Sequence, residues 1–139
     1  MAEKVFVDTN PLVYLVGEQE PFYSKTLKFM ADHISKNSEF YTSTITDAEF
    51  LVRPLSENDT EQIYRYREFL KKLNFLKCFV NEQISEKAAI LRAKYKDIKL
   101  PDALQLAASL VCGCDIFLTN DKQLKQVEEV NVVYLDELK

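Results

Sequence analysis

The order in which short apolar runs and longer helical patterns alternate limits the possible folds of this chain more than any other feature. Lys4–Val7 is a continuous run rich in β-branched and aromatic residues, which is typical of a strand buried on both faces. Further strands are expected at Glu39–Thr42, Leu76–Val80, Asp115–Thr119 and Val132–Tyr134. Because strands separated by helices form parallel sheets, we expect a three-layer α/β/α fold with a central parallel sheet of four to five strands.

Apolar side chains at helical spacing occupy the intervals between these runs. Their periodicity and end signals predict helices over Phe22–Ile34, from an N-cap at Asp59 to Leu73, from Ser85 onward, and from Pro101 to a stop at Gly113. No repeat, low-complexity segment or linker divides the 139 residues. We therefore expect one domain over residues 1–139.

The charge balance is acidic, with 18 Lys+Arg against 22 Asp+Glu and a formal net charge of −4. This balance argues against nucleic-acid binding through bulk positive charge, although it allows acids to gather locally for metal chemistry. A hydrophobic content of 47% excludes a disordered chain. No apolar run approaches the roughly 20 residues of a spanning helix, and no secretory segment is recognisable, so a cytoplasmic location is expected.

Cysteine and histidine usage excludes several common kinds of site. Cys78, Cys112 and Cys114 are odd in number, and two of them flank Gly113, which makes a poor disulfide framework. No usual zinc-finger spacing fits these residues and His33, so we expect reduced, structural cysteines. His33 is the one histidine and is expected on a helix surface. Histidine-based nucleophilic catalysis is therefore disfavoured.

Four acids are expected at one edge of the sheet. Asp8 and Asp121 each follow a predicted strand, and the carboxyl ends of parallel strands are where α/β proteins place their sites. Asp102 lies in the first turn of the Pro101 helix, and Glu49 lies about one helical turn beyond the second strand.

Each acid also has a simpler structural interpretation. Asp8 and Asp121 suit helix caps, Asp102 suits a helix dipole, and Glu49 suits a solvated charge. Together, however, four unpaired carboxylates would repel one another and raise one another's pKa unless a cation joined them. Carboxylate oxygens suit Mg²⁺ or Mn²⁺, either of which lowers the pKa of a bound water. The set therefore favours metal-dependent chemistry on a phosphate.

Four ordered blocks carry a resemblance to a known family. They are Val5–Asn10, Ser43–Glu49, Leu100–Ala108 and Asp115–Asp121. With these blocks the chain resembles the PIN-domain family over essentially its whole length, and within it the VapC-type toxin ribonucleases. The resemblance implies that the acidic quartet falls on Asp8, Glu49, Asp102 and Asp121.

The same resemblance implies supporting roles at four neighbouring positions, which are Thr9, Asn10, Thr119 and Asn120. The chain departs from the family pattern at Gln105, where many relatives carry His, and at Asn120, where Arg is frequent. These departures bear on substrate preference and RNA contacts. Asp47 and Asp115 lie outside the matched positions and are interpreted as structural.

The function implied is hydrolysis of RNA phosphodiesters by a Mg²⁺- or Mn²⁺-dependent endoribonuclease, the toxin of a type II toxin–antitoxin pair. Asp8 and Asp102 would be the leading metal ligands. Asp121 would complete the site directly or through water, and Glu49 would bind a second ion or orient the attacking water. The implied partners are RNA, a cognate antitoxin and a second copy in a homodimer.

Three alternatives stay open at this stage. A PIN-domain nuclease of RNA processing or decay would carry the same quartet. A phosphatase with Asp8 as nucleophile is disfavoured because the second aspartate expected two residues later is Asn10. A noncatalytic PIN-like binding module is disfavoured by the four intact carboxylates.

Overall fold

A five-stranded parallel sheet forms the centre of the computed structural model, which describes residues 2–139. The strands are β1 (Lys4–Val7), β2 (Glu39–Ser43), β3 (Leu76–Cys78), β4 (Ile116–Thr119) and β5 (Asn131–Tyr134), in the spatial order β3-β2-β1-β4-β5. All five predicted strands are confirmed. Their ends shift by at most two residues, as is usual for boundaries read from sequence.

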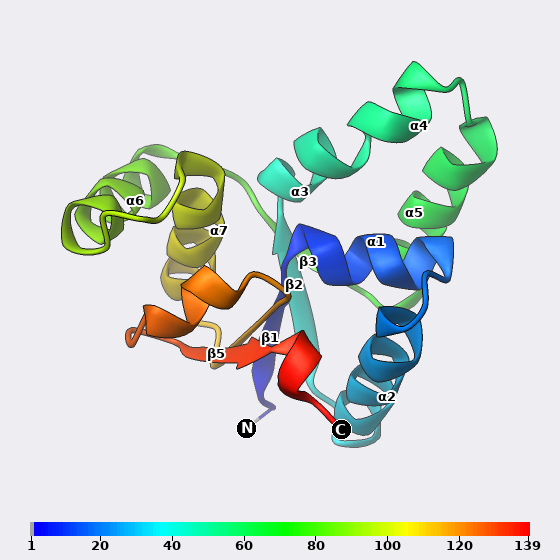
Figure 1. The fold of residues 1–139 in the computed structure, drawn as a ribbon, viewed down its shortest axis with the longest axis horizontal. Helices are drawn as coiled ribbons and strands as arrows, with labels where there is room; N and C mark the ends of the chain where they lie inside the picture. Colours follow the sequence, from blue (N-terminus) through cyan, green and yellow to red (C-terminus); the bar gives the residue numbers. More distant parts are fainter. Residues whose placement is uncertain (1) are drawn as a thin grey trace.

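Helices connect the strands and cover both faces of the sheet (Figure 1). They are α1 (Thr9–Gly17), α2 (Phe22–Ser35), α3 (Thr44–Phe50), α4 (Val52–Ser56), α5 (Thr60–Lys72), α6 (Glu82–Lys94) and α7 (Leu100–Val111), with short 3₁₀ helices η1 (Lys122–Gln126) and η2 (Leu135–Glu137). The predicted cap is confirmed, since the Asp59 side chain accepts from the Gln62 N–H. Helix α6 starts earlier than predicted because Asn81 caps it. No helix within residues 2–139 has both the length and the hydrophobicity to cross a membrane.

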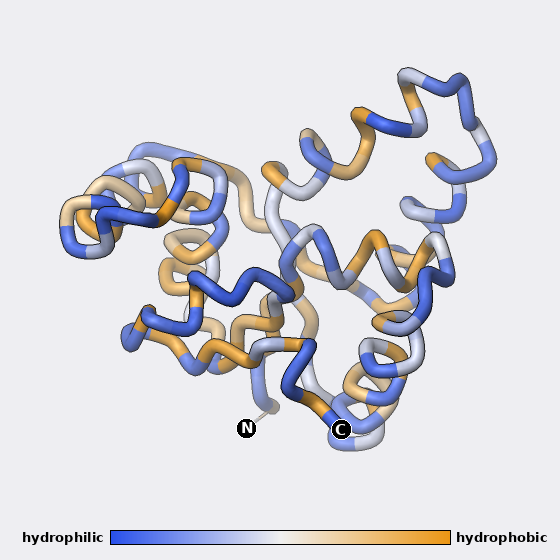
Figure 2. Tube along the Cα trace, in the orientation of Figure 1, coloured by the Kyte–Doolittle hydropathy of each residue, from blue (hydrophilic) through white to orange (hydrophobic). Residues whose placement is uncertain are grey.

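Side-chain alternation along the strands builds two apolar layers. Phe6 and Phe117 point to one face, where their stacked rings pack beneath α6 and α7. Val7 and Leu118 point to the other, beneath α1, α2 and α5. Hydropathy along the chain follows this arrangement, with apolar strands at the centre and polar segments such as the α4–α5 connection outside (Figure 2). The expected α/β/α fold is confirmed.

The central strand β1 determines where a site can form. It pairs with β2 on one side and β4 on the other, and the Asp8 N–H extends the second ladder by donating to the Leu118 carbonyl over 2.9 Å. The chain leaves β1 toward β2 and β3 and later returns on the other side to form β4 and β5. The carboxyl ends of β1 and β4 therefore flank the crevice of a topological switch point.

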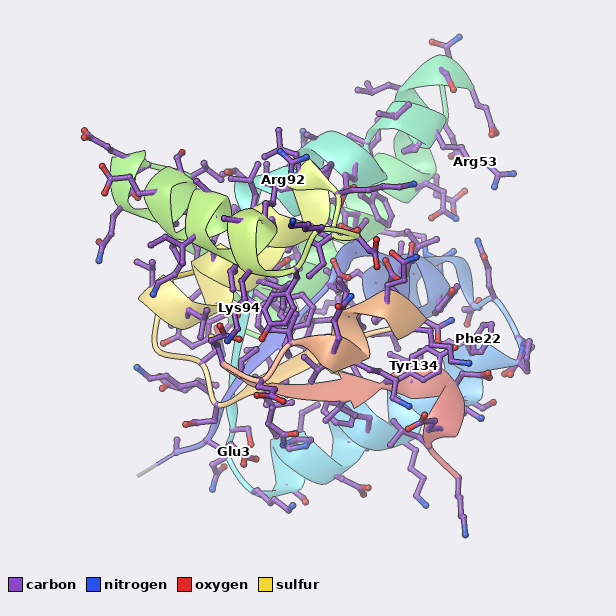
Figure 3. All side chains as sticks on the ribbon, turned by 60° about the vertical axis from the view of Figure 1, so that its left-hand side comes forward. Glu3, Phe22, Arg53, Arg92, Lys94 and Tyr134 are labelled. Atoms are coloured by element: carbon purple, nitrogen blue, oxygen red, sulfur yellow. A yellow bond between two sulfur atoms is a disulfide. The ribbon has the colours of Figure 1, made fainter. Side chains whose placement is uncertain are left out.

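Two expectations about individual residues are wrong. Cys78 and Cys112 form a disulfide because the fold brings the end of β3 beside the end of α7, and Cys114 is free and buried. His33 lies on the inner side of α2, its ring 4.3 Å from that of Phe29 and its Nδ1 3.3 Å from Glu3 Oε1. Burial lowers its pKa. Glu3 precedes β1, so His33 sits at the amino end of the sheet, opposite Asp8 (Figure 3, where Glu3 is labelled).

Candidate functional site

Asp8 is the most buried of the four predicted acids, with 5% of its surface exposed. It follows β1 directly and caps α1, accepting from the Thr9 N–H at Oδ1 over 2.8 Å. Its other oxygen, Oδ2, accepts from Thr119 Oγ1 at the end of β4 over 2.8 Å. The interpretation of Asp8 as a helix cap is therefore correct, and Asp8 also faces the crevice that the switch point opens.

Gln105 lies directly behind Asp8 and is fully buried. Its Nε2 donates to Thr46 Oγ1 (2.7 Å), Thr9 Oγ1 (3.2 Å) and Asp8 Oδ1 (3.3 Å), and its Oε1 accepts from Ser43 Oγ. The sequence marked Gln105 only as a departure from the family pattern, and the structure places it beneath the site. The available signal was its spacing of three residues from Asp102, which puts both side chains on one face of α7.

Glu49 projects from the last turn of α3 and is exposed. Thr9 Oγ1 donates to Glu49 Oε1 over 2.6 Å, so Thr9 joins Glu49 to the buried network around Asp8.

Asp121 and Asp102 lie at the same edge of the sheet, Asp121 at the start of η1 and Asp102 in α7. Asp121 caps η1 by accepting from the Gln123 N–H, and its own N–H donates to Thr119 Oγ1 over 3.1 Å. Asp102 is half-buried in the first turn of α7. Figure 1 shows the starts of α1 and α3 and the upper end of α7 converging around the carboxyl ends of the central strands.

The pKa values of Asp102 and Asp8 reflect both burial and the charges of the neighbouring acids. Desolvation, with Asp8, Asp121 and Glu49 as neighbouring charges, raises the pKa of Asp102 to about 7. Desolvation likewise raises the pKa of Asp8 to about 6, against the opposing hydrogen bonds from Thr119, Thr9 and Gln105. The structure thus brings Asp8, Glu49 and Asp121 within electrostatic reach of Asp102, and burial makes ionisation of Asp8 and Asp102 costly.

The donor set fits a hard divalent cation by its chemistry, because it consists of carboxylate oxygens. One further oxygen, Asn120 Oδ1, is buried without a hydrogen-bond partner between Thr119 and Asp121. Within residues 2–139, no three His, Cys, Asp or Glu side chains lie close enough to hold one ion jointly.

The other predicted residues divide into two groups. Thr9 and Thr119 hydrogen-bond to the acids, and Asn120 Nδ2 donates to the Tyr14 hydroxyl over 3.0 Å. Asn10 is exposed, and its side chain makes no hydrogen bond to the residues that the structure describes.

Asp47 and Asp115 have structural contacts, in agreement with their interpretation from the sequence. Asp47 accepts from the Tyr66 hydroxyl (2.8 Å) and pairs with Lys77. Asp115 accepts from the Lys4 N–H over 2.8 Å, which places it at the amino edge of the sheet, away from the quartet.

The raised pKa of Asp102 predicts a pH-dependent cost to the fold. Its folded pKa of about 7 lies above the ordinary value of 3.8, so the folded state binds more protons between these values and the free energy of unfolding falls as pH rises. Because Asp102 is half-exposed, solvent screening limits this contribution to roughly 1–2 kcal/mol. In EDTA, Asp102→Asn should therefore gain roughly 1–2 kcal/mol relative to the wild type between about pH 5 and pH 8.

Urea denaturation of both proteins at the two pH values measures this difference. Both proteins contain His33, so its contribution to the pH dependence of the free energy of unfolding cancels in the comparison. That contribution has the opposite sign, because the pKa of His33 is lowered. A stability difference that stays constant with pH would contradict the proposed repulsion at Asp102.

Comparisons with known proteins agree with this architecture. VapBC2 from Rickettsia felis, solved with a promoter DNA fragment, is similar with a TM-score of 0.72 and 18% identity, over 94% of this chain and 98% of that one. FitAcB from Neisseria gonorrhoeae gives 0.71 and 17%, over 96% and 99%. The sarcin-ricin loop cleaving toxin VapC20 from Mycobacterium tuberculosis gives 0.67 and 17%, over 91% and 98%. At these identities the likeness shows a shared fold.

Curated protein sequences show no match to the chain. The family model of the PIN domain does match, over residues 5–130, and therefore includes all four acids and both threonines that bind them. This match spans most of the 139 residues and agrees with the parallel sheet, its strand order and the acidic edge. The chain belongs to the PIN domain family.

Proposed function

We propose that this chain is a divalent-metal-dependent endoribonuclease, a single PIN domain that serves as the toxin of a type II toxin–antitoxin pair. The observation that carries the proposal is the set of four carboxylates at the switch point, where burial and then the charges of the other acids raise the pKa of Asp102 to about 7. Support for RNA as substrate comes from the similar fold of a toxin described as cleaving the sarcin-ricin loop.

Asp8 and Asp102 would hold the ion, Mg²⁺ or Mn²⁺, with Asp121 contributing through a bound water. When bound, such an ion lowers the pKa of a water and offsets charge on a phosphate. Thr9 donates to Oε1 of the exposed Glu49, and the Glu49 carboxylate would hold a second ion or orient the attacking water and accept its proton. In-line attack breaks the P–O3′ bond and leaves a 5′-phosphate and a 3′-hydroxyl.

The buried position of Asp8 argues against the phosphatase alternative. Both of its oxygens accept hydrogen bonds, and only 5% of its surface is exposed, so it is poorly placed to attack a phosphorus atom. His33, at the opposite edge, is too far away to act as a base at this site. Proton transfer in the proposed reaction therefore falls to the carboxylates.

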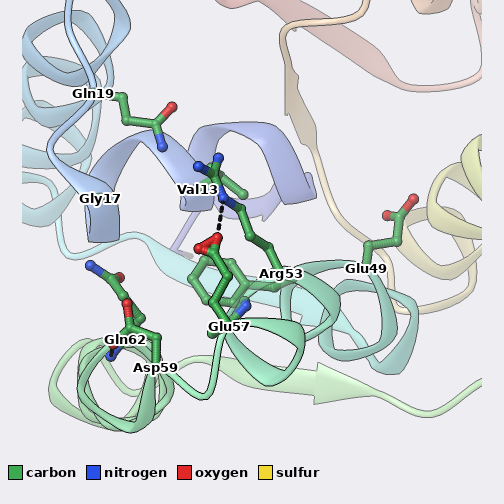
Figure 4. A pocket seen from close by; sticks show the side chains of 10 residues that line it. Val13, Gly17, Gln19, Glu49, Arg53, Glu57, Asp59 and Gln62 are labelled. Atoms are coloured by element: carbon green, nitrogen blue, oxygen red, sulfur yellow. Dashed lines mark hydrogen bonds and ion pairs between the residues drawn. The ribbon is translucent and has the colours of Figure 1, made fainter.

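A groove beside Glu49 supports the proposed antitoxin partner. A pocket of about 300 Å³ opens between α1, α3, α4 and α5, lined among others by Val13, Phe50 and Pro54, with Glu49 at its edge (Figure 4). Arg53 and Glu57 form an ion pair across its wall. A peptide seated there would adjoin the acidic edge, and the similar structures include toxin–antitoxin complexes.

Exposed apolar side chains on the helices are candidate surfaces for protein contacts, including the proposed homodimer. The amphipathic segments Tyr23–Ser35 and Asp59–Leu73 mostly pack on the sheet through residues such as Met30 and Tyr66. Their exposed apolar residues are Leu27, Ile34 and Tyr64, and α4 adds Val52 and Leu55. Molar mass measured by light scattering, alone and with the candidate antitoxin, tests both assemblies.

Incubation of the purified protein with matched RNA and DNA oligonucleotides tests the reaction. We expect RNA cleavage in Mg²⁺ or Mn²⁺, none in EDTA, and products with 5′-phosphate ends. Absence of cleavage across a broad RNA panel with either ion would favour the noncatalytic binding module. Cleavage that a product of a neighbouring small gene does not inhibit would favour the second candidate, a nuclease of RNA processing or decay.

A further inference from the structure

We infer that Gln105 is a positioning residue that holds Asp8 and Glu49 in a fixed mutual arrangement through two branches of one buried amide. This inference rests on the proposed function, since it concerns the same site. Gln105 is fully buried within α7 and therefore does not touch RNA. Its effect must reach the reaction through the groups that it binds.

The contacts of Ser43 determine which way the amide of Gln105 faces. Ser43 Oγ accepts from the Ile45 N–H over 3.0 Å, where it caps α3, so its own proton is free to go to Gln105 Oε1. A hydroxyl has one proton to donate. With Oε1 held in this way, the NH₂ group must face Thr46, Thr9 and Asp8. The opposite orientation would set an amide oxygen against the Asp8 carboxylate.

The two protons of Nε2 serve three acceptors. The shortest contact is to Thr46 Oγ1 at 2.7 Å, which leaves the second proton shared between Thr9 Oγ1 (3.2 Å) and Asp8 Oδ1 (3.3 Å). Thr46 in turn lies 2.8 Å from Thr42 Oγ1, which contacts the Val7 carbonyl over 3.0 Å. The amide is thus anchored to the backbone of β1 just before Asp8.

The hydrogen bond from Gln105 to Thr9 also links the Gln105 amide to Glu49. Thr9 Oγ1 accepts from Gln105, and its single proton goes to Glu49 Oε1 at 2.6 Å because the other acceptor, Thr46 Oγ1, lies farther away at 3.4 Å. Glu49 is exposed on α3 and would otherwise sample several rotamers. Gln105 on α7 therefore fixes the position of Asp8, which follows β1, relative to Glu49 on α3.

Substitutions at position 105 separate positioning from simple packing. Gln105→Met keeps the length and shape of the side chain but removes both N–H donors. Gln105→His restores one N–H donor near the same place. Ser109→Ala is the matched control, because Ser109 is also fully buried on α7 but bonds only to the Leu106 carbonyl.

Steady-state RNA cleavage and Mn²⁺ titration calorimetry provide the readouts, at a temperature where all variants are folded. For Gln105→Met we expect kcat to fall about 10–100-fold with KM for RNA nearly unchanged, and Mn²⁺ binding to weaken about tenfold or more. Gln105→His should recover most of both losses. Ser109→Ala should keep the wild-type kcat.

Wild-type kcat in Gln105→Met, or a loss carried entirely by KM, would overturn the inference. Equal loss in Ser109→Ala would also overturn it, by showing a general effect of stability. Failure of the proposed function looks different, because the wild type itself would then not cleave RNA. In that case unchanged Mn²⁺ affinity in Gln105→Met would still reject the positioning role.

Discussion

Replacement of Asp8 by asparagine is expected to reduce metal-dependent RNA cleavage more than about 100-fold, beyond the usual cost of losing a group that only supports a metal ligand. Asp8 is buried where the crevice begins, and its carboxylate supplies negative charge at the proposed ion. Asparagine has the same shape and keeps one carbonyl acceptor, but it carries no charge. Single-turnover cleavage of an RNA oligonucleotide in Mn²⁺ measures the difference.

The fold should tolerate this substitution. The Thr119 hydroxyl, which donates to Asp8 Oδ2, can rotate and accept from an amide instead. The pKa of Asp8 is raised to about 6, so loss of its charge removes an electrostatic cost at neutral pH. A drop in activity would therefore not reflect unfolding, which circular dichroism would verify.

Asp115→Asn is the matched control for Asp8→Asn. It makes the same chemical change at the amino edge of the same sheet, where Asp115 accepts from the Lys4 N–H. Wild-type cleavage is expected from this variant. If Asp8→Asn cleaves as fast as Asp115→Asn, the acidic edge is not the catalytic centre.

Manganese binding is expected to stabilise the folded protein strongly. At about a hundred times Kd, a ligand that binds only the folded state adds roughly 2.7 kcal/mol, which for a domain of this size corresponds to a rise in Tm of roughly 6–10 °C. The physical reason is that the ion offsets the cost of burying and bringing together the charges of Asp102 and Asp8, whose pKa values burial and neighbouring acids raise. Thermal denaturation in increasing Mn²⁺, followed by excess EDTA, measures the effect and its reversal.

Asp102→Asn and Asp115→Asn provide the controls for the predicted stabilisation by manganese. Without metal, Asp102→Asn should melt above the wild type at about pH 8, since it lacks the repelled charge, yet it should gain much less from Mn²⁺. Asp115→Asn should gain as much as the wild type. A Tm that millimolar Mn²⁺ leaves unmoved in the wild type would reject the metal site.

Local sequence patterns were sufficient to predict the strands, most helices and the sheet edge at which the acids lie. Asp8 and Asp121 could be placed because each follows a buried strand, and parallel strands end at one edge. Helix α4, only five residues long, has too few turns for its periodicity to be recognised. The disulfide between Cys78 and Cys112 depends on two segments meeting in space, which spacing along the chain does not reveal.

The sequence by itself determined the fold class and the residue types of the site, because hydrophobic periodicity and strand-end positions are local properties of the chain. Only the tertiary structure decided what each side chain touches. It buried His33 against Phe29 at the far edge and directed Asp47 to Tyr66. It also placed Gln105 between Asp8 and Ser43, 97 and 62 residues away along the chain. Hydrogen-bond partners so distant in sequence are selected by how helices pack on the sheet, and no local pattern contains that information.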